Sequence, residues 1–282
     1  MGAETTPIRS REAGENFPVA LRVLPRTYRD DLHAVYAFAR MVDEVGDSFA
    51  GDRLARLAEL DADMERIWGA DVPVEPVLRG LVDTVRRTDI PPEPFHRLIS
   101  ANICDQTRSC YATFDDLRAY CRLSAEPIGR IVLHIFGQAE DEYVRARSDD
   151  VCTALQLLEH WQDVAEDRRA GRIYLPQEDL AAHGVPESDL DAAVATNRLR
   201  ALMRFEIERA ATLLERGSVL VSTLHGWGRL SVAGYVAGGR ATVDALRRTD
   251  GDVLGRDSSP STFATASHLI RLLMWPRTRT RP

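Results

Sequence analysis

Apolar residues return every three or four positions along most of the chain, whereas the strict alternation of a half-buried β-strand is nearly absent. This spacing places apolar side chains on one face of an α-helix. Because such a face must be buried against other helices, the pattern predicts an all-α protein. We expect about nine helices. Their predicted ranges are 29–48, 52–69, 75–88, 92–106, 114–137, 147–170, 188–217, 228–248 and 262–275.

Glycine and proline residues separate the predicted helices, for example at Gly51 and Gly137. No internal repeat and no low-complexity linker divides the 282 residues. We therefore expect a single domain over residues 1–282, with flexible tails at 1–12 and 276–282.

The charge balance argues against several classes of protein. The chain has 36 basic and 43 acidic residues and a net charge of -7, so nucleic acid is not expected as a partner. It shows neither an apolar signal segment nor an apolar stretch long enough to span a membrane. The cysteines lack C-x-x-C spacing, which favours reduced thiols in a cytoplasmic protein. They are Cys104, Cys110, Cys121 and Cys152.

One predicted helix carries two aspartates on the same face. Asp43 and Asp47 lie one turn apart, on the face that begins with Leu32, Tyr36 and Arg40. Like charges at this spacing repel by about a few tenths of a kcal/mol. A bound Mg²⁺ would offset the repulsion, because this ion prefers oxygen ligands. A single pair of this kind is also common on a solvated acidic helix.

A later predicted helix repeats the arrangement. Glu159, Asp163 and Asp167 follow one another in steps of four, with Glu166 beside them. If the two helices face each other in an antiparallel bundle, the pairs meet across a central cavity. The sequence therefore indicates a Mg²⁺ site, with two solvated acidic faces as the alternative. The predicted ligands are Asp43, Asp47, Asp163 and Asp167.

Two arginines accompany the acidic pairs. Arg40 lies one turn before Asp43, and Arg172 follows the second pair together with Tyr174. The planar guanidinium group of arginine suits phosphate oxygens. These residues are candidates for stabilising a leaving diphosphate, whereas a salt bridge to a neighbouring helix is the alternative for Arg172.

Several runs of sequence resemble the squalene/phytoene synthase family, over about residues 13–245. The closest likeness is to the bacterial hopanoid-pathway branch, which makes hydroxysqualene from presqualene diphosphate. The strongest match is W-Q-D-V-A-E-D followed by R-I-Y-L-P. The matching runs are residues 15–20, 24–25, 36–40, 43–47, 120–125, 127–129, 161–167 and 172–176.

The resemblance implies a helical bundle around a deep apolar cavity, with Mg²⁺ held by the four aspartates at its mouth. It also implies that Arg40, Arg172 and Asn16 bind the diphosphate of an isoprenyl substrate, and that Tyr36 and Tyr174 take part in catalysis. Ionisation would give a cyclopropylcarbinyl cation that rearranges and is quenched by water. No nicotinamide is expected, and the chain has no G-x-G-x-x-G motif.

Three positions depart from the family pattern. Glu44 replaces a usual aspartate, and Cys110 stands where an arginine is expected, which removes a cation from the site. Glu126 replaces a small or neutral residue on a segment that should border the cavity. A buried carboxylate is costly unless it is paired, so Glu126 either faces solvent, pairs with Arg130, or accepts a proton from a polar acceptor molecule.

Glu126 gives rise to a second hypothesis, in which an allylic cation alkylates an aromatic or heteroaromatic acceptor. A third hypothesis from another class is a non-catalytic helical assembly factor. The retained pairs of repelling carboxylates argue against it, because a site without a metal has no use for them.

The C-terminal segment 264–275 is apolar and is followed by Arg277, Arg279 and Arg281. Such a segment can lie weakly in a membrane interface, where the arginines contact anionic head groups. The alternative, which we favour, is that the helix packs onto the bundle and the arginines are only solvated.

Overall fold

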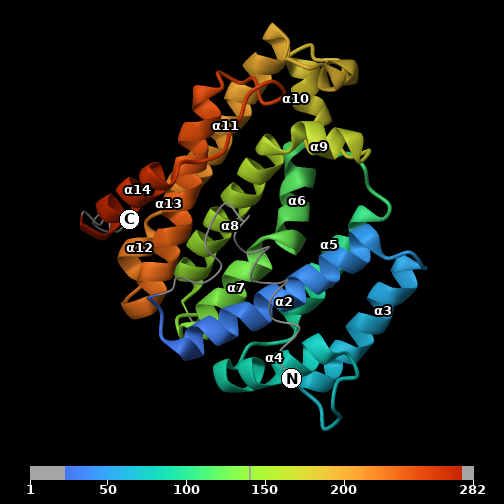
Figure 1. The fold of residues 1–282 in the computed structure, drawn as a ribbon, viewed down its shortest axis with the longest axis vertical. Coiled ribbons are helices and arrows are strands. Elements are labelled where there is room, and N and C mark those ends of the chain that lie inside the picture. Colours follow the sequence, from blue (N-terminus) through green and yellow to red (C-terminus); the bar gives the residue numbers. More distant parts are fainter. Residues whose placement is uncertain (1–22, 140, 275–282) are drawn as a thin grey trace.

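The computed structural model describes residues 23–139 and 141–274. Within these residues every regular secondary-structure element is a helix. The one isolated β-bridge among them joins Cys110 to Ile173. The predicted all-α class is thus confirmed (Figure 1). The single domain over 1–282 stays a prediction, and the tails predicted at 1–12 and 276–282 lie outside the described residues.

The first group of helices surrounds one hydrophobic core, in which Phe38 and Phe95 pack edge to face with ring centroids 5.1 Å apart. Leu57 and Leu81 are fully buried in it. The elements are α2 (Arg26–Ser48), α3 (Arg53–Met64), η1 (Glu65–Ile67), α4 (Pro76–Thr88), α5 (Glu93–Asp105), α6 (Phe114–Ser124) and α7 (Glu126–Ile135), of which α6 contributes mainly to the second core.

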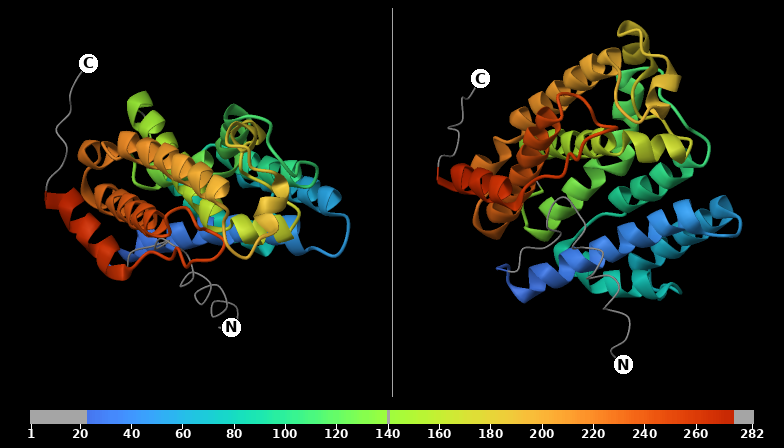
Figure 2. Two further views of the ribbon diagram at one scale, coloured as in Figure 1. Left: turned by 90° about the horizontal axis from the view of Figure 1, so that it is seen from above. Right: turned by 45° about the horizontal axis from the view of Figure 1, so that its top comes forward.

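The second group is built around α8, which packs against α7, α11 and α13 (Figure 2). Trp161 of α8 is fully buried in this second core. The N-terminus of α8 is capped by Asp141, whose carboxylate accepts a 2.8 Å hydrogen bond from the Tyr143 N–H. The elements are α8 (Glu142–Gln162), α9 (Val164–Arg169), α10 (Gln177–Ala182), η2 (Glu187–Asp191), α11 (Asn197–Gly217), α12 (Leu220–Thr223), α13 (Gly226–Arg248) and α14 (Thr262–Met274).

Three long predicted helices are interrupted in the structure. The helix expected over 114–137 breaks at Ala125, because Pro127 cannot donate an N–H to the preceding turn. The one expected over 147–170 ends at Gln162 and resumes at Val164. The one expected over 188–217 becomes η2 and then α11, whose N-terminus is capped by Thr196.

The arrangement of α2 and α8 differs from the expected antiparallel pair. Both run from the lower left toward the upper right in Figure 1, so their C-terminal ends lie on the same side of the molecule. Since each helix has its acidic residues near its C-terminal end, a parallel arrangement brings the two acidic pairs together.

Helix α14 packs against α13 through the buried Leu272. His268 also pairs with Asp244 at 2.8 Å. The favoured expectation, that this helix packs onto the bundle, agrees with these contacts, although Trp275 and the arginines after it lie outside the described residues. In the part of the chain that is described, no helix is both long and apolar enough to cross a bilayer.

Candidate active site

A cavity of about 510 Å³ lies between the two hydrophobic cores. One set of lining residues is apolar and includes Leu32, Val132 and Tyr235. We call the charged set the cavity mouth. It consists of Asp43, Asp47, Asp105, Glu159, Asp163, Asp167 and Arg172. The cavity therefore joins an apolar chamber to a predominantly anionic mouth.

The first acidic pair is held by neighbouring side chains. Asn102 of α5 donates a 3.1 Å hydrogen bond from Nδ2 to Oδ1 of Asp43. Arg172 donates a 2.9 Å hydrogen bond to Oδ1 of Asp47. The close approach of α5 requires Gly46, because a Cβ there would lie 2.2 Å from Oδ1 of Asn102. The protein thus orients both carboxylates of α2.

The second acidic pair lies across a helix break. Asp163 stands between α8 and α9, and its carbonyl accepts a 2.8 Å hydrogen bond from the N–H of Asp167. Asp163 keeps accessible surface, but desolvation by the surrounding protein raises its pKa, and the charges of Asp167 and Glu166 raise it further. His160 opposes this effect. Negative charge is therefore concentrated here with little compensation.

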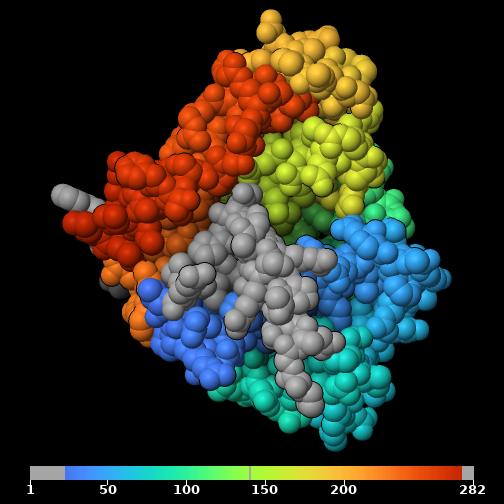
Figure 3. All heavy atoms as spheres, in the orientation of Figure 1, coloured from blue at the N-terminus to red at the C-terminus, as the bar shows by residue number. Residues whose placement is uncertain are grey.

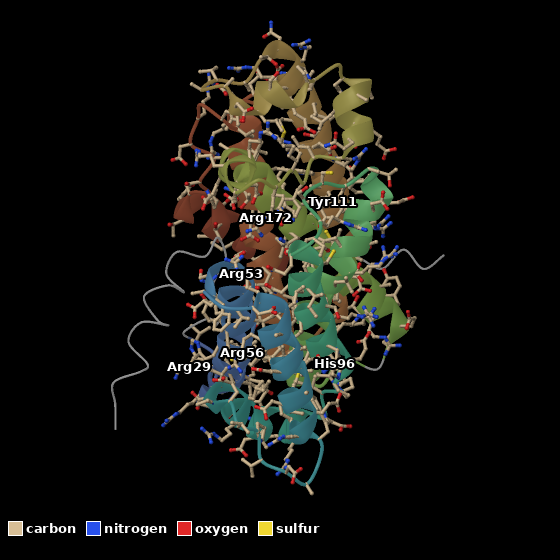
Figure 4. All side chains as sticks on the ribbon, turned by 90° about the vertical axis from the view of Figure 1, so that its right-hand side faces the viewer. Arg29, Arg53, Arg56, His96, Tyr111 and Arg172 are labelled. Atoms are coloured by element: carbon tan, nitrogen blue, oxygen red, sulfur yellow. The ribbon has the colours of Figure 1, made fainter. Side chains whose placement is uncertain are left out.

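A short turn brings Arg172 and Tyr174 to the cavity. Gly171 has φ +81, a conformation that favours glycine. The chain then pairs with the segment before α6, where the N–H of Ile173 donates to the carbonyl of Ser109 at 2.8 Å. Figure 4 shows Arg172 near the α2–α3 turn, marked by Arg53. The alternative foreseen for Arg172, a salt bridge to a neighbouring helix, is formed with Asp47 of the site itself.

Aromatic rings surround Tyr174. His160 stacks on it with ring centroids 3.6 Å apart and an interplanar angle of 12°. Tyr111 and Tyr120 lie at 5.8 Å on other sides. This packing fixes the position of Tyr174 beside the mouth.

Arg40 and Tyr36 also line the cavity, one turn apart on α2. The Nε of Arg40 is buried and has no hydrogen-bond partner among the described residues. An unpaired buried donor on a cavity wall is suited to an anionic ligand. Asn16, the third residue expected to bind diphosphate, lies outside the described residues.

Glu126 does not border the cavity, so the expectation that placed it there is wrong. It is buried, at 7% exposure, behind the lining residues. Thr153 donates a 3.3 Å hydrogen bond to it, and burial raises its pKa. Arg130 pairs instead with Asp149, at 2.7 Å. Glu126 is therefore not among the residues that line the cavity.

The residue of the mouth that sequence patterns missed is Asp105, the last residue of α5. Tyr120 donates a 2.7 Å hydrogen bond to its Oδ2, while its Oδ1 is buried without a partner among the described residues. Burial raises the pKa of Asp105 to about 6, although Tyr120 and Arg172 act to lower it. No acidic repeat marks this residue, and only its approach to Tyr120 in the fold reveals it.

The cysteines and the acidic residues allow two further checks. All four cysteines are free, as expected, and Cys110 is exposed. Within the described residues, no three or more His, Cys, Asp or Glu side chains stand close enough together to hold a metal ion by themselves. The four predicted ligands lie around one cavity, but they do not form a closed set of ligands.

Comparison with known proteins identifies the family and the fold. The sequence model of squalene/phytoene synthases matches residues 10–264. The chain belongs to the squalene/phytoene synthase family. This synthase is 32% identical to the phytoene synthase of Arthrospira platensis over 86% of the chain and 82% of that relative. It is 34% identical to the hydroxysqualene synthase of Zymomonas mobilis over 75% of the chain and 71% of that relative.

A solved structure agrees with this assignment. The crystal structure of squalene synthase HpnC from Alicyclobacillus acidocaldarius matches with a TM-score of 0.77 and 40% identity, over 81% of this synthase and 86% of that chain. The protein is therefore an isoprenoid synthase that acts on an isoprenyl diphosphate, as its motifs predicted. The hypothesis of a non-catalytic assembly factor receives no support from these relatives, which are named as enzymes.

Proposed function

We propose that the synthase converts presqualene diphosphate to hydroxysqualene. The observation that carries this proposal is one cavity in which an apolar chamber meets a mouth of carboxylates and Arg172, with Arg40 also on the cavity wall. The chamber suits the hydrocarbon chains, and the mouth suits the diphosphate. Similarity to squalene synthase HpnC and to a hydroxysqualene synthase supports this choice of reaction.

The donor atoms of the mouth fit Mg²⁺. This ion is usually bound by one or two carboxylates together with substrate phosphates and water, so an incomplete protein ligand set is suitable. We assign Asp43, Asp47, Asp163 and Asp167 as the residues that would hold it. When bound there, Mg²⁺ would neutralise negative charge on the leaving diphosphate.

The arginines have separate tasks in this proposal. Arg40 would offer its guanidinium group to the diphosphate from the cavity wall, and Arg172 provides a planar cation beside Asp47. The tyrosines Tyr36 and Tyr174 line the cavity near these groups and help to position the substrate. The apolar walls exclude bulk water, so that the cation rearranges before it is quenched.

Incubation of the purified protein with Mg²⁺ and a panel of diphosphates tests the proposal. The panel contains presqualene, farnesyl, geranylgeranyl, geranyl and dimethylallyl diphosphates, and mass spectrometry identifies the products. We expect hydroxysqualene from presqualene diphosphate. Phytoene from geranylgeranyl diphosphate, with no turnover of presqualene diphosphate, would contradict it. An aromatic acceptor is not proposed, since Glu126 lies behind the cavity wall.

The packing of α14 on α13 uses only one face of this helix, and we also propose that its outer face contacts an anionic bilayer surface. Phe263, Ile270 and Met274 form a stripe on this helix and are 85%, 56% and 73% exposed. Arg271 is exposed beside it. The sequence continues with Arg277, Arg279 and Arg281, so apolar and basic groups occur together. In Figure 3 α14 forms the left-hand edge of the molecule.

Liposome flotation tests this contact. We expect the protein to float with anionic vesicles at low salt and less at high salt. Replacing Phe263, Ile270 and Met274 with serine should abolish flotation. The matched control replaces Val72 and Val74, which are 68% and 67% exposed, with serine. Failure of the wild type to float at either salt concentration would refute the contact. It would also be refuted if the wild type and the control were dimers in solution and only the triple variant were a monomer, because the stripe would then be a protein interface.

A further inference from the structure

Two chain segments lie side by side between the cavity mouth and α10. The first paired segment, residues 172–179, carries Arg172 and Tyr174 and ends in α10, and the second, residues 109–114, leads into α6. Three backbone N–H groups of the first segment donate to carbonyls of the second. They join Ile173 to Ser109 at 2.8 Å, Gln177 to Tyr111 at 2.9 Å and Glu178 to Ala112 at 3.0 Å. Figure 4 labels Arg172 and Tyr111, one residue of each segment.

Arg209 of α11 contacts both paired segments at the end away from Arg172. Its guanidinium group donates to the two carboxylate oxygens of Asp179, the last residue of the first segment, at 2.7 and 3.2 Å. The Cζ of Arg209 also lies 4.1 Å from the ring centroid of Phe114, the last residue of the second segment. A second ring, that of Phe205, lies 4.4 Å from this atom. One planar cation thus binds a carboxylate and packs against aromatic rings, which lysine does less well.

The contact between Arg209 and Asp179 is sheltered from solvent. Their side chains are 21% and 11% exposed, and the fully buried Glu206 lies against them. The carboxyl oxygens of Glu206 are 3.1 and 3.2 Å from Nη1 of Arg209. Because burial raises the pKa of Glu206 to about 8, this carboxyl is largely protonated at pH 7 and leaves the charge of Arg209 to Asp179. Solvent therefore screens this pair much less than it screens a surface pair.

A second arginine of α11 forms a similar pair in another part of the molecule. Arg200 donates a 2.8 Å hydrogen bond to Asp252, and their side chains are 19% and 4% exposed. Arg200 also donates to the carbonyl of Ala195, at 3.1 Å. The two arginines match in helix, exposure and type of partner, but these hydrogen bonds of Arg200 go to other segments. Arg200 is therefore a suitable control for the effect of losing a sheltered ion pair.

We propose that Arg209 is a positioning residue, which fixes the paired segments to α11 and thereby sets the place of Arg172 and Tyr174 at the cavity mouth. This inference rests on the proposed function, in which Arg172 receives the diphosphate. Arg209 is not among the residues that line the cavity, so it acts through the paired segments. A change at Arg209 should alter the site without removing any group from it.

Amide hydrogen exchange tests the geometric part of the inference without a substrate. The full-length variants are Arg209→Lys and the control Arg200→Lys, each of which keeps the charge but loses the planar group. We expect the amides of residues 173–178 to exchange about tenfold faster in Arg209→Lys and at the wild-type rate in the control. Unchanged exchange in Arg209→Lys would overturn the inference. Faster exchange spread evenly over the whole chain would also overturn it, by assigning Arg209 to overall stability.

A double-variant cycle with Arg172→Lys tests whether Arg209 acts through Arg172. We measure kcat and KM for the diphosphate that the wild type converts. Arg209→Lys alone should lower kcat/KM by about fivefold, and Arg200→Lys by less than about twofold. On top of Arg172→Lys, the same change at Arg209 should cost less than about twofold, because the group that it positions is already altered. A loss of about fivefold in both backgrounds would overturn the inference.

The inference and the proposed function fail separately. If the wild type makes phytoene from geranylgeranyl diphosphate, the proposed function fails, and the cycle run with that substrate still decides the role of Arg209. If hydroxysqualene forms but neither experiment links Arg209 to Arg172, the inference alone is refuted. Thermal melting checks that each variant is folded. If Arg209→Lys does not fold, Phe114→Leu removes the ring contact and keeps the ion pair, and residues 173–178 should then exchange about threefold faster; unchanged exchange would overturn the inference.

Discussion

Asp43 and Asp47 lie on one uninterrupted helix, and each accepts a hydrogen bond from a side chain of another segment. Asp163 lies at the break between α8 and α9 and Asp167 lies within α9, and no arginine pairs with either of them among the described residues. Their nearest cationic candidate is His160, whose Nδ1 is 3.9 Å from Asp167. The two pairs have the same spacing in sequence, but in the part of the chain that is described only the carboxylates of the first pair are held by hydrogen bonds from neighbouring side chains.

Under the Mg²⁺ assignment proposed above, the difference predicts which pair depends more on the ion. At the first pair the protein supplies Asn102 and Arg172, which hold the carboxylates in place without an ion. At the second pair no such side chain holds the carboxylates among the described residues, and desolvation by the surrounding protein together with the charges of Asp167 and Glu166 raises the pKa of Asp163. We therefore expect the second pair to depend more strongly on Mg²⁺.

The largest expected effect comes from Asp163→Asn and Asp43→Asn. Each should lower diphosphate release by about a hundredfold, because a neutral amide binds Mg²⁺ much more weakly. Raising the Mg²⁺ concentration should restore Asp43→Asn further than Asp163→Asn, since Asp47 is still held by Arg172. The measurement is the rate of diphosphate release against Mg²⁺ concentration. Equal recovery of the two variants would show that the two pairs depend equally on Mg²⁺. More than a tenth of wild-type turnover in either variant would contradict the assignment of these aspartates as metal ligands.

A smaller effect is expected from Arg172→Lys. Lysine keeps the charge but cannot bind Asp47 and a phosphate oxygen with one planar group, so turnover should fall by about tenfold. Arg168→Lys is the matched control, because Arg168 pairs with Asp191 outside the cavity, at 2.8 Å. Steady-state kinetics of both variants checks this. A control that loses as much as Arg172→Lys would assign the effect to general destabilisation.

Glu206 tests whether a raised pKa alone marks a metal site. It is fully buried in α11, and burial raises its pKa to about 8 despite Arg209. The unfolded chain loses this proton near pH 4.3, so the wild type should lose stability as pH rises from about 4 to 8. Glu206→Gln should therefore gain about 1 kcal/mol or more over wild type at pH 8 and little at pH 4.5. Urea denaturation at several pH values measures this gain. A gain that depends on Mg²⁺ would contradict our view that the raised pKa of Glu206 comes from burial and does not mark a metal site.

The smallest effect concerns the metal-free protein. Asp163→Asn should raise its free energy of unfolding by about a few tenths of a kcal/mol, because it removes a repulsion. Asp43→Asn should not, because it weakens the bond from Asn102. Thermal melting in the presence of a chelator compares the two variants. A shift of the same sign in both would mean that the pairs are equivalent.

The sequence predicted most of this architecture because helical periodicity and the acidic spacing are local patterns. The ends of α4 and α5 lie within about one residue of their predicted positions. The break at Ala125 was predictable from Pro127, whereas neither proline nor glycine marks the break at Asp163. Four-residue helices such as α12 carry too few turns for periodicity to reveal them.

The site was predictable only in part. The spacing singled out the four aspartates, but it could not show that α2 and α8 run in the same direction. Glu126 was placed wrongly and Asp105 was missed for the same reason: which side chains line a cavity depends on how distant helices pack. Glu126 lies behind the cavity wall, whereas Asp105 lines the mouth.

The contact between Gly46 and Asn102 has a consequence for how this site can evolve. Any larger residue at position 46 displaces the Asn102 amide and thereby releases Asp43. The residue at position 46 therefore constrains the position of the side chain at 102. We expect positions 46 and 102 to covary among descendants of this sequence, so that Asp43 is inherited together with the neighbour that holds its carboxylate.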